Sequence, residues 1–246
     1  MEPLQSTMRF LVVCALASLP QAAVAHDLIT AESAQAWLAA VAESQKTIAS
    51  AEPAAKRARA NLELGKTLDE IRELLNLDLA AHGRVQGLPS SFLMSELKVR
   101  GAQLAFAPQT NRFLANLRYY RAALKLEPSG PIAAEAGFRL LQGYFYDSFT
   151  SDPLQPGTQT RAQLAEQISL GERLLKVQSQ PGEREETSFI VAIHYMQAAH
   201  SGRDAQERAA FAIRARALAA EFLGSYPESM RAATLAHLLD SLPAGR

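Results

Sequence analysis

The sequence predicts an all-α protein. Ala and Leu are abundant and β-branched residues are sparse, a composition that favours helix over sheet. Apolar residues recur at helical spacing along most of the chain, and Pro, Gly and Ser separate the successive runs. No polar–apolar alternation is long enough to predict a strand. The punctuation predicts about nine helices, joined by short turns as antiparallel hairpins and stacked as a solenoid.

The N-terminal elements follow from their boundary residues. Thr30 is expected to cap a first helix, and Pro53 to open a second that ends at Gly83. Within the second helix one apolar stripe follows the i, i+4, i+7, i+11 spacing, and further leucines widen it, so contacts on two sides are expected. The stripe consists of Leu64, Leu68, Ile71 and Leu75.

Three further helices are expected after Gly83, in the middle of the chain. The third opens at Pro89 and carries apolar residues as far as Phe106. The fourth starts at Thr110 and Asn111 and ends at Pro128. Pro131 then opens a fifth helix, which is rich in aromatic residues.

A loop with Pro153, Pro156 and Gly157 marks a possible break at 150–160. Four helices are expected after it, the third of them started by the Asp-x-x-Glu capping pattern of Asp204 and Glu207. They span about 160–179, about 184–201, 205–226 and 227–241, the last opened by Pro227. Apart from the possible break, residues 26–246 are interpreted as a single helical domain.

Residues 1–25 have the composition of a cleavable signal peptide. Arg9 supplies the positive charge, residues 10–19 form a short apolar run, and small residues precede the expected cleavage between Ala25 and His26. The run is too short to cross roughly 30 Å of hydrocarbon, and no later stretch reaches the ~18 apolar residues of a spanning helix. We therefore expect a periplasmic protein with no transmembrane segment in the mature chain.

Composition excludes several classes of function. The chain has 246 residues, with 25 basic and 25 acidic side chains, so it lacks the basic excess of a nucleic-acid-binding protein. Its only cysteine lies inside the expected signal peptide, which leaves no internal disulfide framework. With 48% hydrophobic residues, the chain is expected to bury a substantial core.

The junctions after Pro128 and Pro227 resemble each other, and the stretches around them resemble tetratricopeptide repeats. Residues 123–128 are similar to the end of that repeat's second helix, and residues 222–229 to the F-L-x-x-Y-P-x-S junction of periplasmic tetratricopeptide-like proteins. Those proteins include outer-membrane assembly lipoproteins and cell-division coordinators. The resemblance covers 111–145 and 205–240. It implies a scaffold for protein contacts and carries no catalytic residues over.

The resemblance is incomplete in three respects. Asn116 stands where the repeat usually has a small residue, although Tyr120 matches its aromatic position. The prolines at helix junctions, Pro128, Pro181 and Pro227, do not follow the regular 34-residue period of the family. Residues 26–110 have no such match.

No recognised arrangement of catalytic or metal-binding residues occurs. The five histidines form no His-Glu-x-x-His pair, and nucleophile elbows, Ser-x-x-Lys motifs and phosphate-binding glycine loops are absent from the sequence. Adjacent carboxylates occur at Asp69-Glu70 and at Glu185-Glu186, where we expect a solvated helix face. The sequence therefore predicts no catalytic residue, no cofactor and no metal.

Aromatic residues provide the candidate contacts to a partner. Adjacent residues on a helix diverge by about 100°, so the groups at 119–120 and 144–146 cannot all face one core. Exposed rings in a helical array are suitable anchors for a bound peptide. The candidates are Tyr119, Tyr120, Tyr144 and Tyr146. The alternative is that helices on both sides bury them all.

Three functions follow from these observations. The first is an exported helical scaffold that binds a protein or peptide partner in the cell envelope and is not an enzyme. The second is a periplasmic carrier of a lipid or small ligand, with a cavity between helices. The third is a cell-wall hydrolase, which needs two carboxylates about 5–10 Å apart. The identity of the partner and the oligomeric state stay open.

Overall fold

The computed structural model describes residues 28–85, 87–148, 154 and 159–242, and in this part of the chain it confirms the all-α class. It contains nine helices and a small β-hairpin. The helices are α2 (Ala31–Ala49), α3 (Ala54–His82), α4 (Leu88–Val99), α5 (Arg118–Leu126), α6 (Gly130–Asp147), α7 (Arg161–Val177), α8 (Pro181–Ser201), α9 (Ala205–Ser225) and α10 (Met230–Leu239). The expected signal peptide, the cleavage between Ala25 and His26 and most of the 150–160 loop lie outside the described residues.

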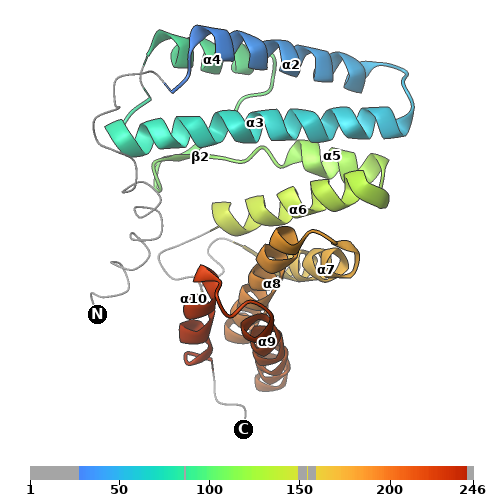
Figure 1. Cartoon of the computed structure of the whole chain (residues 1–246), viewed down its shortest axis with the longest axis vertical. Helices are drawn as coiled ribbons and strands as arrows, with labels where there is room; N and C mark the ends of the chain where they lie inside the picture. Colours follow the sequence, from blue (N-terminus) through green and yellow to red (C-terminus); the bar gives the residue numbers. More distant parts are fainter. Residues whose placement is uncertain (1–27, 86, 149–153, 155–158, 243–246) are drawn as a thin grey trace.

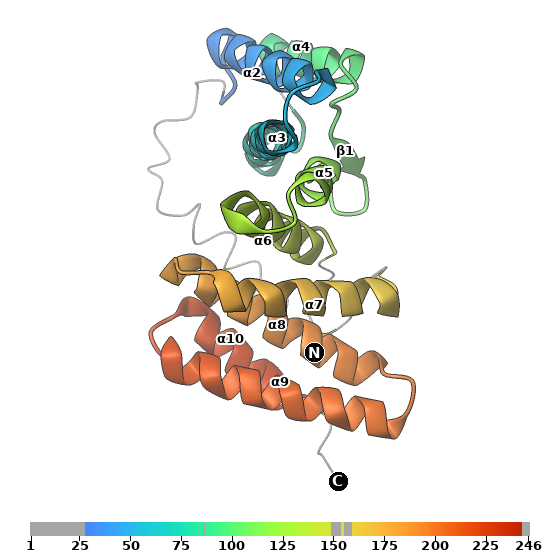
Figure 2. The ribbon, with the colours of Figure 1, turned by 90° about the vertical axis from the view of Figure 1, so that its right-hand side faces the viewer.

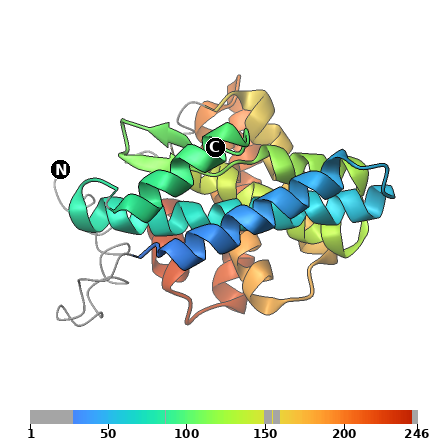
Figure 3. The same ribbon diagram turned by 90° about the horizontal axis from the view of Figure 1, so that it is seen from above.

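The helices are stacked in layers along the long axis of the molecule (Figures 1 and 2). At one end, α2 and α4 lie side by side across α3, as the view from above also shows (Figure 3). Below α3 come α5 and α6, and then α7, α8, α9 and α10, each in contact with the preceding helix. In addition, α6 contacts α3 and α8, and α10 contacts α8. From α5 onward the stacking follows the chain, whereas α4 turns back onto α2 and α5 returns to α3.

Most helix ends are where the local sequence predicts them. Thr30 caps α2 in a reciprocal capping box with Ser33, because each side chain accepts a hydrogen bond from the other residue's backbone amide. Pro53 precedes α3, and Gly83 ends it in the left-handed conformation, with φ of 71°. Asp204 caps α9 by accepting the Glu207 amide, as the sequence predicts.

The segment between α4 and α5 differs from the prediction. Residues 105–107 and 112–114 form an antiparallel hairpin, β1 (Ala105–Ala107) and β2 (Arg112–Leu114), where the sequence predicted the end of one helix and the start of the next. Gly101, with φ of 63°, ends the first helix early. Pro108 and the left-handed Asn111, with φ of 49°, then build the turn. Each strand has only three residues, too few to show alternation.

The starts of α8 and α10 also shift by a few residues. Helix α10 begins at Met230, three residues after Pro227, because Ser229 caps it by accepting the Arg231 amide. Helix α8 begins at Pro181, before the expected start near residue 184, with the proline in its first turn.

Helix α3 connects two hydrophobic clusters. The predicted stripe is confirmed, because its four residues are completely buried and pack with α2, α4 and Phe113. Ala58 and Leu62, at the other end of α3, belong instead to the larger cluster formed with α5 to α10. The expected contacts on two sides are therefore also confirmed, with α2 on one side and α5 on the other.

Candidate functional site at the end of helix α6

The four candidate tyrosines differ in their accessibility. Tyr120 is 0% exposed and Tyr119 is 8% exposed, because α5 is packed between α3 and α6. Neither ring is available to a partner, so the structure removes these two residues from the candidate contacts. Tyr144 is half-buried and its hydroxyl accepts a hydrogen bond from Arg121 Nε at 2.9 Å. Tyr146 is 38% exposed, and it is the candidate that presents a ring to solvent.

Tyr120 has a structural role instead. Its ring lies against Gly65 of α3, and its hydroxyl donates a hydrogen bond of 2.6 Å to Asp69 Oδ2. Burial, together with the adjacent Asp69 carboxylate, raises the pKa of this phenol far above its usual value of 10.0. Tyr120 therefore stays protonated and fixes α5 on α3.

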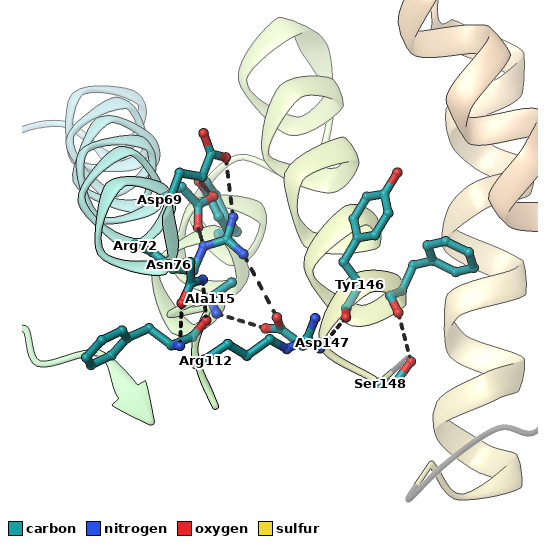
Figure 4. A network of polar contacts seen from close by, with 12 residues as sticks. Asp69, Arg72, Asn76, Arg112, Ala115, Tyr146, Asp147 and Ser148 are labelled. Atoms are coloured by element: carbon teal, nitrogen blue, oxygen red, sulfur yellow. Dashed lines mark hydrogen bonds and ion pairs between the residues drawn. The ribbon is translucent and has the colours of Figure 1, made fainter. Parts of the chain in front are cut away.

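A partly buried ionic network joins α3 to the end of α6 (Figure 4). The Arg72 guanidinium lies between two carboxylates, with Nε 3.3 Å from Asp69 Oδ1 and Nη1 3.9 Å from Asp147 Oδ1. Asp147 also accepts the backbone amide of Ala115 at 2.8 Å. Burial raises the pKa of Asp147, while the Ala115 amide and Arg72 act in the opposite direction. For Asp69 the expected solvated face is wrong, because Asp69 is buried on the side of α3 where Tyr120 of α5 binds it, whereas Glu70 is exposed.

The hairpin is held in the same network. Asn76 of α3 accepts the Phe113 amide at 2.7 Å and donates to the Phe113 carbonyl at 3.0 Å, so it forms two hydrogen bonds with one residue of β2. The guanidinium of Arg112 donates to the carbonyl oxygen of Tyr146 (Figure 4). The backbone at Tyr146 and the side chain of Asp147 are thus both anchored.

The Tyr146 side chain is directed away from this network, toward α8 (Figure 4). Its hydroxyl donates a hydrogen bond of 2.8 Å to Glu186 Oε1, and Arg231 Nη2 of α10 lies 3.6 Å from Glu186 Oε2. Burial and the Glu186 carboxylate raise the pKa of Tyr146 to about 12. The phenol is therefore neutral and keeps its donor at physiological pH.

A second carboxylate completes this ionic cluster. Glu185 Oε1 accepts a hydrogen bond of 2.6 Å from the Ser229 hydroxyl and lies 3.4 Å from Arg231 Nη1. Both glutamates of the adjacent pair are thus partly buried and bound to α10, not on the solvated face expected from the sequence. Met230, at the start of α10, is 79% exposed. We refer to Tyr146, Glu186, Met230 and Arg231 as the Tyr146 surface.

The sequence indicated only one of these four residues. Because Tyr144, Phe145 and Tyr146 are consecutive in a helix, at least one had to face away from the core, and Tyr146 does so while Phe145 is buried. Glu186 and Arg231 lie 40 and 85 residues further along the chain, and no local pattern connects them with Tyr146.

Another buried polar residue lies on α8. His194 is completely buried, its ring is 5.7 Å from that of Phe145, and neither ring nitrogen has a hydrogen-bond partner among the described residues. Burial lowers the pKa of His194 to about 3. The imidazole is therefore neutral at physiological pH.

Comparisons with protein families, with curated proteins and with solved structures gave no significant match. Within the described ranges, no three or more His, Cys, Asp or Glu side chains are grouped so that they could hold a metal ion. The described helices also include none with the length and apolar character needed to cross a membrane.

Proposed function

We propose that the protein is an exported helical scaffold that binds a protein or peptide partner in the cell envelope, with Tyr146 as its principal anchor. The observation that supports this proposal is that Tyr146 exposes its ring while the residue is held at two points. Its backbone carbonyl accepts a hydrogen bond from Arg112, and its hydroxyl donates one to Glu186, which pairs with Arg231. Export rests on the expected signal peptide at 1–25. The resemblance to tetratricopeptide-like scaffolds at 111–145 and 205–240 supports the same function.

Immobilising a side chain at an interface costs about 0.5–1.5 kcal/mol of conformational entropy, and much of that cost is avoided when the free protein already holds the side chain in place. Tyr146 is held in this way. The Tyr146 surface also combines Tyr, Met and Arg, residue types that are enriched in protein interfaces. Both properties favour a partner that receives an aromatic ring in a pocket.

The experiment is site-specific photo-cross-linking in the native envelope. A photoreactive residue replaces Met230, which is 79% exposed, and a matched control replaces Ile213 of α9, which is 64% exposed. We expect one stoichiometric protein product from position 230 and none from position 213. Tyr146→Ala should abolish the product without lowering the melting temperature substantially, whereas Tyr146→Phe should retain it.

Two results would contradict the proposal. One is cross-linking that is unchanged in Tyr146→Ala, because the ring would then not be the anchor. The other is the absence of a protein product together with a co-purifying lipid or small molecule, which would instead support the carrier function.

A further inference from the structure

Helix α4 carries an apolar stripe on its outer surface. Leu88 is 86% exposed, Phe92 is 51% exposed and Val99 is 79% exposed. At about 100° per residue these three positions fall within roughly 40° of each other around the helix. The side chains that α4 contributes to the core, Leu93 and Leu97, lie on the opposite side. The helix is therefore apolar on two faces, and the described chain covers only one of them.

The location of this stripe is unusual. Helices α2 and α4 form one end of the stack, remote from α9 and α10 (Figures 1 and 2). In proteins built from stacked helices, the terminal layer normally presents a polar outer face, because an apolar end would associate. Next to α4, the outward face of α2 carries the small exposed residues Ala36, Ala39 and Ala40, which permit close approach of another surface.

The stripe is complementary to an antiparallel copy of itself. The positions 88, 92, 95 and 99 repeat at intervals of four and three residues, as in the contact line of two packed helices. In the antiparallel pairing Leu88 faces Val99 of the second copy, and Phe92 faces Ser95 of the second copy. A large side chain thus lies opposite a small one. The parallel pairing would instead place Phe92 on Phe92 and leave a gap between the two Ser95 residues.

The charges beside the stripe agree with the same pairing. In the antiparallel arrangement Glu96 is opposite Pro89 of the second copy, and Lys98 is opposite Ser91 of the second copy. No like charges are brought together. Glu96 is in addition neutralised within its own chain, by Arg100 at 3.3 Å.

We propose that two copies of this chain associate through α4, antiparallel and related by a two-fold axis that passes between Phe92 and Ser95. The contact line along α4 is only about 16 Å long, which is short for a standard complex that buries ~800 Å² per partner. The dimer is therefore weak and reversible. Because it uses the end of the stack opposite α10, it leaves the Tyr146 surface free for a partner.

Chemical cross-linking tests the orientation. Leu88→Cys and Val99→Cys are made separately in the full chain with Cys14→Ser, so that no other thiol is present. A short bis-maleimide should join the two variants when they are mixed, and neither should cross-link to itself, because equivalent residues lie roughly 16 Å apart in the antiparallel dimer. Cross-linking of each variant to itself would refute the antiparallel geometry.

Sedimentation of the wild-type chain tests the association itself. We expect a concentration-dependent shift from monomer to dimer, and in Phe92→Ser a dissociation constant raised by ~tenfold or more. The exposed control Ile213→Ser should behave as wild type, and circular dichroism verifies that both variants fold. A wild-type chain that stays monomeric into the millimolar range, or dimerisation that Phe92→Ser does not weaken, would overturn the proposal. Neither result would bear on cross-linking at position 230.

Discussion

Gly65 of α3 should not tolerate even an alanine. A Cβ atom built at this position would lie 2.6 Å from Tyr120 Cε1 and 2.8 Å from Cζ, both well inside van der Waals contact. The ring cannot simply rotate away, because the Tyr120 hydroxyl is bound to Asp69, one helical turn further along the same face of α3. Relief of the clash requires α5 to move off α3 or the buried hydrogen bond to break.

The magnitude follows from opposing contributions. Overpacking a core by one methyl group costs typically 1–3 kcal/mol. Weakening a hydrogen bond to a buried carboxylate adds about 1.5–3 kcal/mol. Alanine recovers about 1 kcal/mol, because it favours an α-helix more than glycine does. We therefore expect Gly65→Ala to reduce the free energy of unfolding by about 2–4 kcal/mol, and the melting temperature by roughly 4–16 °C for a chain of this size.

Urea denaturation of four proteins tests this explanation as a double-mutant cycle. Gly65→Ala is introduced both into the wild type and into Tyr120→Leu, where the smaller side chain removes the clash and the hydroxyl. In the Tyr120→Leu background the substitution should change sign and stabilise the protein by about 0.5–1 kcal/mol, through helix propensity alone. Equal effects in the two backgrounds, or stabilisation of the wild type by Gly65→Ala, would refute the reasoning.

Three other predictions concern charged and titratable groups. Arg72→Met removes the cation shared by the largely buried Asp69 and Asp147 and should cost about 3–5 kcal/mol in chemical denaturation. Arg59→Met, which removes an exposed 3.9 Å ion pair, should cost less than about 1 kcal/mol. Similar losses in the two variants would show that burial does not strengthen the Arg72 network. The pKa of His194 is about 3 in the folded protein, where burial lowers it from its ordinary value of 6.5. The unfolded chain therefore binds the extra proton first, and stability should fall by up to about 1.4 kcal/mol per pH unit below pH 6.5. An equally steep fall in His194→Leu would exclude His194 as its source. The absorbance titration of Tyr146, identified by its loss in Tyr146→Phe, should have a midpoint near 12. Glu186→Gln should lower this midpoint only in part, because the burial of the phenol persists. An unchanged midpoint would mean that Glu186 does not interact with the phenol.

The sequence predicts those structural features that depend on contacts within one helical turn. Capping residues such as Thr30 and Asp204 act on amides three residues away, so their roles are visible in the sequence. The hairpin at 105–114 is decided by Gly101, Pro108 and Asn111, and its strands are too short for a periodic signal. Short strands stabilised by tertiary contacts, here Asn76 with Phe113, are not readable from local pattern.

The candidate site was predictable only in part for the same reason. The divergence of adjacent helical residues indicates that a ring at 144–146 faces outward, and Tyr146 does. At 119–120 the same argument fails, because α5 has helices on both sides and buries Tyr119 as well as Tyr120. The charged partner of Tyr146 comes from a distant segment, and Arg72, although only three residues from Asp69, reaches its second carboxylate, Asp147, from another helix. Only the tertiary arrangement shows that Glu186 and Arg72 are partly buried.

Helix α3 makes a direct physical link between the two hydrophobic clusters. It contributes Leu64, Leu68, Ile71 and Leu75 to one cluster and Ala58 and Leu62 to the other, all from one continuous helix. Local opening of either cluster would expose residues of this helix and weaken its hold on the other. We therefore expect the layers around α3 to melt as one cooperative unit, and a cut between α4 and α5 to leave both fragments with an unfilled core.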